Sequence, residues 1–311
     1  MSGSDHPAVA NPAARRPRFS FIIVSYNTLP LTRAAISSIA KHAAAFSREI
    51  ILVDNHSTDD SVACLRREFP GLKIIALDEN RGFAAANNAG ARLAAGEWLI
   101  LMNSDAELIP GTMPALADLL DRHPKLDVLG GQLLNPDGSL QTSVLVNYHL
   151  VRDTPGELVE VSGVVGAFMV VRRDLWRKLN GMDEGYFFFG EEADFCARAV
   201  QAGAVLRWSP RFRVIHHRGG SSKSVSLRAI IESCESERYS WRKNMPAAEY
   251  RSAVQRAGRR FALKTIWFFS LAMLTLFRLR AFTGRFKKYF HLWKWHLRGC
   301  PPGWGLRPME K

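Results

Sequence analysis

Four short hydrophobic runs recur in the first third of the chain, and a polar cluster follows each of them. The runs are Phe19–Ser25, Ile50–Val53, Leu72–Leu77 and Trp98–Met102. Their β-branched and aromatic residues and their short length predict buried strands. The segments between them predict helices: Pro30 to about His42, Ser61–Phe69 after the capping residues of DNHSTDD, and an Ala-rich helix that Gly96 ends.

Strands that alternate with helices predict an α/β fold, with a mostly parallel sheet and helices on both of its faces. The polar clusters SYNT, DNHSTD, DENRGF and NSD should then lie at one edge, because the carboxyl ends of parallel strands meet there. Any one cluster alone would be ordinary turn chemistry, but four at one edge predict a ligand site. No GxGxxG follows the first strand and no GxxxxGK[ST] occurs, which argues against a dinucleotide fold of that type and against a P-loop.

The composition of the 311 residues, 47% hydrophobic and 23% charged, is typical of a globular protein. The net charge of +13 is concentrated at one end: residues 256–311 carry 13 of the 42 Lys and Arg residues and a single acid, Glu310. The same tail is rich in aromatic residues, among them Trp267, Phe268, Phe269, Phe277, Phe286, Tyr289, Phe290, Trp293 and Trp295. Basic and aromatic residues together are typical of a helix on an anionic membrane surface. Nucleic-acid binding is disfavoured because it rarely needs so much apolar surface, and a homo-oligomer contact stays open as an alternative.

The apolar segment Thr265–Phe277 is 13 residues long, which is short of the about 20 that span a bilayer. It therefore predicts an in-plane or re-entrant helix. Residues 1–18 lack an apolar h-region and predict a flexible leader rather than a secretory signal. The four cysteines, at positions 64, 196, 234 and 300, have no paired spacing, which fits a reducing cytosol and argues against a zinc site built on CxxC pairs.

Seven motifs in order carry a resemblance to a known family. They are FIIVSYN, ILVDNHSTD, ENRGFAAANNAG, LILMNSDA, GAFMVVRRDLW, FFFGEEADFCARAVQAG and VIHHRGGSS. Together they resemble the family-two inverting glycosyltransferases with the GT-A fold, in particular the rhamnosyltransferase-like branch that builds bacterial surface polysaccharides. The resemblance implies a Rossmann-like GT-A catalytic domain over residues 19–225, with a nucleotide-binding part (19–108) and an acceptor-side part (109–225). Residues 226–311 would form a C-terminal helical membrane-associating region.

The resemblance also implies a nucleotide-sugar site. The first motif would cradle the base and ribose, and the Asp54 carboxylate would accept a charge-assisted hydrogen bond from a uracil or thymine imide. Gly82 would let the backbone approach the sugar closely. Capping is the alternative role of Asp54, and a helix start is the alternative for the Gly82 segment. The implied substrate-binding residues are Ser25, Tyr26, Asn27, Asp54, Asn55, Asn80, Arg81, Gly82, Phe83, Asn87, Asn103, Ser104, Asp105, Gly166 and Ala167.

NSD resembles the DXD-like metal motif of the family. Asn103 stands where the first carboxylate would be, which leaves Asp105 as the principal ligand of a divalent cation, Mg²⁺ or Mn²⁺, that stabilises the diphosphate leaving group. His216 is implied as a second ligand and His217 is the alternative to it. Residues 218–222 would fold over the diphosphate. Turn capping by Asp105 and a structural role for His216 stay open.

GEEAD supplies three acids, Glu191, Glu192 and Asp194, at the start of a helix that runs to about Ala202. Inversion needs one base that takes the proton of the acceptor hydroxyl. In relatives the second acid of the motif is that base, which is Glu192 here. Crowded acids raise at least one pKa, which favours a base, although complementing the helix dipole is the alternative role. The aromatics of GYFFFG either stack on a sugar or fill the core.

The implied function is an inverting, metal-dependent glycosyltransferase at the cytoplasmic face of the inner membrane, peripherally bound. The favoured donor is dTDP-L-rhamnose and the acceptor a polyprenyl-linked glycan. The alternatives are a transferase that uses a UDP-hexose, a non-catalytic nucleotide-sugar or glycan-binding protein, a sugar nucleotidyltransferase, for which SYNTLPLTR is a poor loop, and a basic-tailed nucleic-acid binder.

Overall fold

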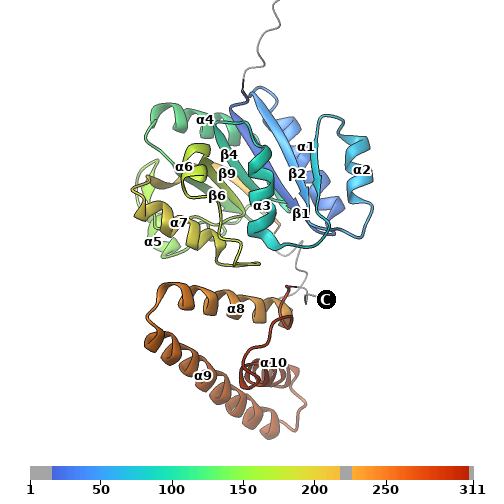
Figure 1. Ribbon diagram of the computed structural model, residues 1–311, viewed down its shortest axis with the longest axis vertical. Coiled ribbons are helices and arrows are strands. Elements are labelled where there is room, and N and C mark those ends of the chain that lie inside the picture. Colours follow the sequence, from blue (N-terminus) through green and yellow to red (C-terminus); the bar gives the residue numbers. More distant parts are fainter. Residues whose placement is uncertain (1–15, 218–225, 308–311) are drawn as a thin grey trace, which may run out of the picture.

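The computed structural model describes residues 16–217 and 226–307 and places an α/β domain above a group of three C-terminal helices (Figure 1). The strands and helices expected in the first third of the chain are confirmed, with ends that shift by one or two residues. They are β1 (Phe19–Ser25), α1 (Leu29–His42), β2 (Arg48–Asp54), α2 (Ser61–Glu68), β3 (Lys73–Ala76), α3 (Gly82–Leu93) and β4 (Trp98–Asn103).

The second part of the domain adds short strands around a long one. Its elements are β5 (Ala106–Leu108), α4 (Thr112–Arg122), β6 (Val128–Leu134), α5 (Tyr148–Asp153), β7 (Val159–Glu160), β8 (Phe168–Arg172), α6 (Arg173–Lys178), α7 (Glu191–Gln201) and β9 (Leu206–His216). All strands join one sheet in the order β3-β2-β1-β4-β8-β6-β9-β5, with β7 paired to β9.

The sheet is mixed, so the expectation of a mostly parallel sheet holds for β1 to β4 but not for the second part. There, β6 and β9 are parallel, but β8 runs antiparallel between β4 and β6, and β5 and β7 run antiparallel to β9. A parallel neighbour requires a crossover of about a dozen residues, usually a helix. Helices α1, α2 and α3 supply such crossovers between the strands of the first part.

Apolar residues cover both faces of the sheet, as expected. Along β1, Phe21 and Ile23 face the cluster that contains α1 and α4, and Ile22 faces the cluster that contains α3 and α7. Successive side chains of a strand point to opposite faces, so this alternation seals the sheet on both sides. The Ala-rich sequence of α3 fits this packing, because a Cβ at Gly90 would overlap the side chain of Ile22.

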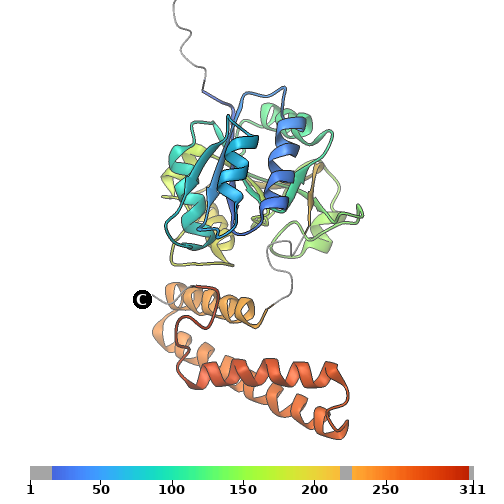
Figure 2. The same ribbon diagram turned by 90° about the vertical axis from the view of Figure 1, so that its right-hand side faces the viewer.

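The three C-terminal helices are α8 (Leu227–Asn244), α9 (Ala247–Leu274) and α10 (Arg280–Leu297). α8 docks on the α/β domain: Lys243 Nζ lies 2.8 Å from Asp183 Oδ2, and Ser236 Oγ donates to Phe188 O at 2.9 Å. α9 and α10 run side by side as an antiparallel hairpin (Figure 2). In the part of the chain that the structure describes, we find no helix with the length and apolar character to cross a membrane.

The segment Thr265–Phe277 is not a separate helix. Its residues up to Leu274 form the end of α9, and the remainder forms the turn to α10. The carboxyl ends of β1, β2 and β4 lie at the edge of the domain that faces α8 and the hairpin (Figure 1). The predicted site therefore lies at the edge of the domain that faces the C-terminal helices.

Candidate active site

The strand register brings the predicted site residues to one level. Ser25 pairs with Asp54, Val24 with Asn103, and Asp54 with Ala76. Neighbouring strands lie about 4.8 Å apart, so the polar ends of β2 and β4 flank the end of β1 on either side. The edge that the sequence predicted is thus a compact surface rather than four separate turns.

Hydroxyl and amide contacts join the turns at this edge. The Oγ atoms of Ser25 and Ser104 both contact Thr28 Oγ1, at 3.1 and 3.2 Å, which connects the end of β1 to the turn after β4. Asn27 Oδ1 accepts from the backbone N–H of Thr58 at 2.8 Å. Ser25, Asn27 and Ser104 therefore hold the edge together, while the Tyr26 ring between them is 46% exposed and open to a stacking ligand.

Asn55 holds the segment from Asn80 to Gly82 in place. Its Nδ2 donates to Asn80 Oδ1 at 2.9 Å, and its Oδ1 accepts from the backbone N–H of Arg81 at 2.9 Å. Gly82 has φ +81°, and a Cβ at that position would overlap the Phe187 carbonyl oxygen. Only glycine fits this close approach without strain.

Asp54 presents an acceptor without a partner. Its side chain is buried, and Oδ2 accepts from the backbone N–H of Ser57 at 3.0 Å. Oδ1 is buried and has no hydrogen-bond partner among the residues that the structure describes. A buried polar atom left unpaired costs about 1–3 kcal/mol, so this oxygen is suited to a ligand N–H.

Asn87 and Asn88, adjacent in α3, have different environments. Asn88 is fully used: Nδ2 donates to Met182 O at 2.8 Å, and Oδ1 accepts from the Met182 N–H at 2.9 Å. Asn87 Nδ2 donates to Phe83 O at 2.9 Å, but its buried Oδ1 lacks a partner within the described chain. Asn88 therefore fixes the loop before α7, and Asn87 is the one that can still accept a hydrogen bond from a ligand.

His216 faces the acid of the NSD motif. β5 pairs with β9 so that Ala106 lies opposite His216, which puts His216 Nε2 at 3.3 Å from Asp105 Oδ1 and 3.5 Å from Asn103 Nδ2. The other ring nitrogen, Nδ1, lies 3.0 Å from Gln141 Oε1. Both His216 and Asp105 are largely buried.

Gln141 sets the tautomer of His216. Its Nε2 donates to His216 O at 2.6 Å and to Asn135 Oδ1 at 2.7 Å, so its Oε1 must be the atom that faces the ring. An amide oxygen accepts only, so Nδ1 carries the proton and the neutral ring offers a lone pair at Nε2 toward Asp105. A lone pair beside a carboxylate oxygen is stable when a proton or a cation lies between them. In this donor set the carboxylate suits Mn²⁺ or Mg²⁺, and the imidazole, which suits these ions less, can still bind them.

His217 takes a different direction. Its Nε2 lies 2.6 Å from Glu107 Oε1, and its backbone N–H donates to Asp105 O at 2.8 Å. Of the two histidines, only His216 thus directs its ring to Asp105. Residues 218–222, which the sequence placed over the diphosphate, lie outside the described residues. The described residues contain no group of three or more His, Cys, Asp and Glu side chains that could hold a metal, so further ligands would have to come from Asn103, the diphosphate or water.

The strand β8 and its preceding residues connect the NSD motif to the GEEAD acids. The backbone N–H of Asn103 donates to Ala167 O at 3.0 Å. A Cβ at Gly166 would lie 3.6 Å from Glu192 Cβ and 3.7 Å from Phe83 Cε1. Glu192 and Phe83 therefore meet over Gly166, one residue away from the contact with Asn103.

The three acids of GEEAD occupy three different environments. Asp194 forms ion pairs with Arg198 and with Lys243 of α8. Glu191 is buried, and burial followed by the charge of Glu192 raises its pKa well above the ordinary range. Burial also raises the pKa of Glu192, while the N–H groups of Glu192, Gly190 and Gly166 oppose that shift. Both Glu191 Oε2 and Glu192 Oε2 lack partners among residues 16–217 and 226–307.

These environments separate the acids by what each can do. Asp194 is committed to holding α7 against α8. Glu191 is buried, whereas Glu192 is only partly buried and is the acid beside Gly166, which makes Glu192 the better placed of the two to act as a base. That assignment agrees with the role that the family resemblance implied for Glu192, which stays a prediction.

Gln141 is a site residue that the sequence did not indicate. It belongs to no motif and lies in an irregular segment whose place beside His216 depends on the sheet. A buried glutamine is the only signal, and burial at that position could not be predicted from its neighbours.

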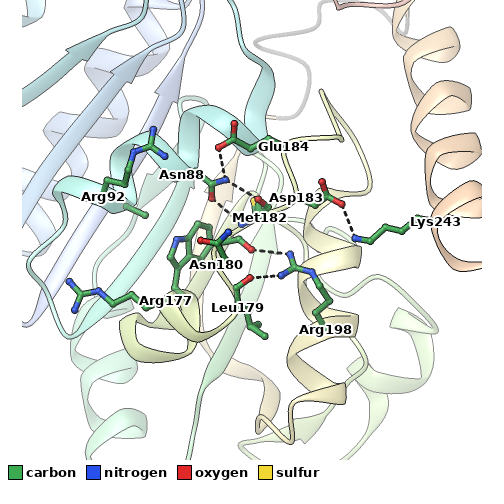
Figure 3. Close-up of a pocket in the computed structure, with 13 residues that line it drawn as sticks. Asn88, Arg92, Arg177, Leu179, Asn180, Met182, Asp183, Glu184, Arg198 and Lys243 are labelled. Carbon is green, nitrogen blue, oxygen red and sulfur yellow. Dashed lines mark hydrogen bonds and ion pairs between the residues drawn. The ribbon is translucent and has the colours of Figure 1, made fainter.

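A surface pocket of about 750 Å³ lies elsewhere, between α3, α6, α7 and α8 (Figure 3). Its residues include Asn88, Trp176, Asn180, Arg198 and Lys243. Arg198 donates to the carbonyl oxygens of Leu179 and Gly181, and Lys243 reaches Asp183. No residue of the predicted site lines it, and its residues Asn88, Arg198 and Lys243 hold the loop before α7.

Known families match two parts of the sequence. Residues 20–179 match the family described as Glycosyl transferase family 2, and residues 147–218 match the one described as N-terminal domain of galactosyltransferase. The chain is 27% identical over 236 residues to an N-acetylglucosaminyl-diphospho-decaprenol L-rhamnosyltransferase of Mycobacterium tuberculosis. That match covers 65% of this chain and 76% of the relative.

Two solved structures have a similar fold. One is the mannosyltransferase PcManGT from Pyrobaculum calidifontis in complex with GDP-Man and Mn²⁺, with a TM-score of 0.57 and 16% identity over 93% of this chain and 89% of that chain. The other is S. aureus TarS 1-349 in complex with UDP-GlcNAc, with a TM-score of 0.54 and 17% identity over 91% of this chain and 92% of that chain. At such identities the likeness concerns the fold alone, and it confirms the GT-A expectation.

We expect Glu191→Gln to change how stability depends on pH. The unfolded chain loses the Glu191 proton near the ordinary pKa of 4.5, whereas the folded protein holds it to higher pH. This group therefore stabilises the fold fully below pH 4.5, and that contribution is lost as pH rises through the folded pKa. Glutamine has no proton to lose, so the variant should match the wild type at pH 4 and exceed its melting temperature at pH 8.

Thermal melts across that pH range measure the effect. Glu79→Gln, which changes an exposed acid, is the matched control and should leave the profile unchanged. A wild type and a Glu191→Gln variant with parallel profiles would show that Glu191 is not protonated at neutral pH.

Proposed function

We infer that this chain, which belongs to glycosyl transferase family 2 and is a glycosyltransferase, transfers a sugar from a nucleotide donor to a lipid-linked glycan with inversion. One observation carries the inference: the contacts through Ala167 and Gly166 join the NSD turn to Glu192. A donor bound at the strand edge would therefore present its sugar carbon next to a carboxylate. Each group needed for a single displacement then lies in one region.

The nucleotide would be held by the first two turns. Asp54 Oδ1, which has no partner in the described chain, would accept a hydrogen bond from the imide N–H of thymine or uracil. Tyr26 would stack on the base, and the segment from Asn80 to Phe83 would lie under the ribose and sugar. Asn87 Oδ1 would accept a hydrogen bond from a hydroxyl of the donor.

We favour dTDP-L-rhamnose as the donor, because the similar M. tuberculosis protein is named an L-rhamnosyltransferase. A UDP-hexose is the alternative, supported by the likeness to TarS, which was solved with UDP-GlcNAc. The printed name of the rhamnosyltransferase also supports a polyprenyl diphosphate-linked glycan as the acceptor. A role in bacterial surface polysaccharide synthesis would follow from that acceptor.

A divalent cation would bind between Asp105 and His216, with Asn103 as a neutral neighbour. Mn²⁺ or Mg²⁺ bound there would neutralise the charge that grows on the diphosphate as the glycosidic bond breaks. Two contacts within the protein would orient the ligands of this cation. Gln141 holds the His216 ring with its lone pair toward Asp105, and the N–H of His217 holds the Asp105 backbone carbonyl.

Glu192 would act as the base. It would take the proton of the acceptor hydroxyl while that oxygen forms a bond to the anomeric carbon, and the electron pair of the breaking bond would leave with the nucleoside diphosphate. The raised pKa of Glu192 strengthens it as a base. Its Oε2, which no described group occupies, is the atom that would receive the proton. Attack from the face opposite the diphosphate inverts the sugar carbon.

The lipid-linked acceptor would place the protein at the cytoplasmic face of the inner membrane as a peripheral protein. The edge that carries the site faces the C-terminal helices (Figure 1). A membrane on that side would bring the acceptor to Glu192 along the shortest path.

Glu192→Gln should lower turnover by roughly two to four orders of magnitude and leave donor binding near normal, because glutamine keeps the shape but cannot take a proton. Steady-state turnover and calorimetric donor binding measure the two quantities. Glu191→Gln is the matched control and should retain turnover. Loss of turnover in Glu191→Gln together with normal turnover in Glu192→Gln would reassign the base.

Asp105→Ala should abolish the Mn²⁺-dependent part of donor binding, measured by calorimetry with and without Mn²⁺. Gln141→Met should weaken Mn²⁺ binding by about 10- to 100-fold, the range for a residue that orients a metal ligand. Free Mn²⁺ followed by electron paramagnetic resonance measures that change without any reaction. Gln201→Met, at an exposed position of α7, is its control. Unchanged binding in Asp105→Ala would contradict a metal at this position.

A panel of nucleotide sugars should separate the donors by thermal stabilisation. A ligand present at 100 times its Kd raises the free energy of unfolding by about 2.7 kcal/mol, which is a shift of a few degrees. We expect dTDP-L-rhamnose to give the largest shift, UDP-hexoses a smaller one, and Asp54→Leu to remove both. Equal shifts with purine nucleotide sugars would contradict imide recognition by Asp54.

A further inference from the structure

The turn between α9 and α10 exposes an unusual amount of apolar surface. We call residues 263–279 the hairpin tip. Leu274 is 81% exposed and Leu276 is 72% exposed. The other exposed apolar residues of the tip are Leu263, Ile266, Trp267, Phe269, Met273, Phe277 and Leu279.

Packing inside the hairpin does not account for this surface. Gly258, Thr265 and Ala272, spaced seven residues apart, are the buried side of α9, and a Cβ at Gly258 would overlap His296 of α10. Leu263, Trp267 and Leu274 lie on the outward side. Among the described residues these three have large exposed fractions and form a stripe along one face of the helix.

The backbone of the turn also holds apolar side chains outward at a cost. Leu276 and Phe277 have φ of 48° and 55°, a left-handed conformation that costs an L-residue about 1–2 kcal/mol. Glycine or asparagine would relieve that strain, and neither occurs in the turn. Strained residues that persist in a fold are found at functional positions.

The charge around the tip selects its partner. Arg278 and Arg280 lie in or next to the turn, and α10 adds exposed basic residues such as Arg285 and Lys287. Residues 256–309 contain no acid. Two copies of this surface would repel each other, whereas an anionic bilayer complements both the charge and the apolar residues.

The basic residues limit how deeply the tip can enter a membrane. From Leu263 to Leu274 the helix rises about 17 Å at 1.5 Å per residue, but this stretch includes Lys264, and Arg278 and Arg280 lie at its far end. Arg285 of α10 lies beside Phe268, in the middle of the stretch. Because charged side chains are costly in the hydrocarbon core, only the apolar side chains of the tip would enter the leaflet, and the helix backbone would stay close to the lipid phosphates.

We propose that the hairpin tip binds an anionic bilayer as a shallow wedge: its exposed apolar side chains enter one leaflet, and its arginines and lysines lie on the lipid phosphates. This assigns the membrane contact to named side chains of the tip. It deepens the peripheral location proposed above and rests on the proposed function only for the identity of the membrane. Figures 1 and 2 place the site edge on the side of the domain that faces α8 and the hairpin, so the membrane-binding helices and the site lie on the same side of the domain.

Vesicle flotation of the full chain tests the wedge. The vesicles contain phosphatidylcholine alone or with phosphatidylglycerol, and the test variant is the double substitution Leu274→Glu and Leu276→Glu. Both side chains are exposed, so folding should be unaffected. The matched control, Leu93→Glu with Leu150→Glu, changes two leucines of the α/β domain that are 53% and 59% exposed.

We expect the wild type and the control to float with the anionic vesicles and the tip variant to lose binding by about tenfold or more. Raising salt from 0.1 to 0.5 M should weaken wild-type binding, as should removal of phosphatidylglycerol. Tip-variant binding equal to the control would overturn the proposal, as would wild-type binding that is indifferent to both salt and anionic lipid.

Light scattering of the same proteins without lipid tests whether a second copy of the chain covers the tip instead. A wild-type dimer that the tip substitutions dissociate, with no loss of vesicle binding, would assign the surface to a second copy of the chain and overturn the wedge. Calorimetric donor binding in the tip variant keeps the two hypotheses apart, because it should be unchanged if the tip acts only on lipid. A wild-type protein that binds no nucleotide-sugar donor would contradict the proposed function but not the wedge.

Discussion

The register of β1 with β2 and β4 is the constraint on which the rest of the site depends. It sets Ser25 level with Asp54 and Val24 level with Asn103. Because side chains in a sheet alternate with a period of two, a slip by one residue would turn Asp54 away from the edge and bury Val53 in the wrong face. Apolar residues on both faces prevent that slip. The packing of the core thus determines which polar residues lie next to one another at the strand ends.

The site contains buried polar atoms whose desolvation lowers the stability of the fold, and the packing of the core offsets that cost. Asp54 Oδ1, Asn87 Oδ1, Glu191 Oε2 and Glu192 Oε2 are buried acceptors without partners in the described chain, and such atoms are costly in a folded protein. Gly82 gives up side-chain packing so that the backbone of Phe187 can come close. Within the described residues, buried atoms without partners also occur on Arg48, Arg173, Glu235 and Arg238, outside the site, so such an atom indicates a ligand site only together with the motifs around it.

Features that depend on neighbouring residues in the sequence were predicted, whereas features that depend on contacts between distant residues were not. The strands and helices of the first third follow from periodicity and capping, and the residues of the rim follow from strand ends. The mixed second half of the sheet could not be predicted, because β8 and β9 pair with strands far away in sequence. Gln141 was missed for the same reason: its contact with His216 joins residues 75 positions apart. Asn87 rather than Asn88 was predicted for the site, and the structure supplies a physical reason, because the backbone of Met182 engages the Asn88 side chain.

The C-terminal helices show the limit of composition as evidence. Charge and aromatic content predicted a membrane-associating region, but they could not show that Thr265–Phe277 divides between the end of α9 and a turn. The contacts of Lys243 with Asp183 and Asp194 connect α8 to the loop and helix that carry Glu192.

The central claim is that one nucleoside diphosphate fills the space between Asp54, Asp105 and Glu192. A crystal structure of the protein with dTDP and Mn²⁺ tests it most directly. The account predicts the thymine imide within hydrogen-bond distance of Asp54 Oδ1, and Mn²⁺ bound by Asp105 and His216 Nε2 with the diphosphate on its open side. Density for the nucleotide in the pocket between α3, α6 and α8, with Asp54 Oδ1 still unpaired, would contradict it.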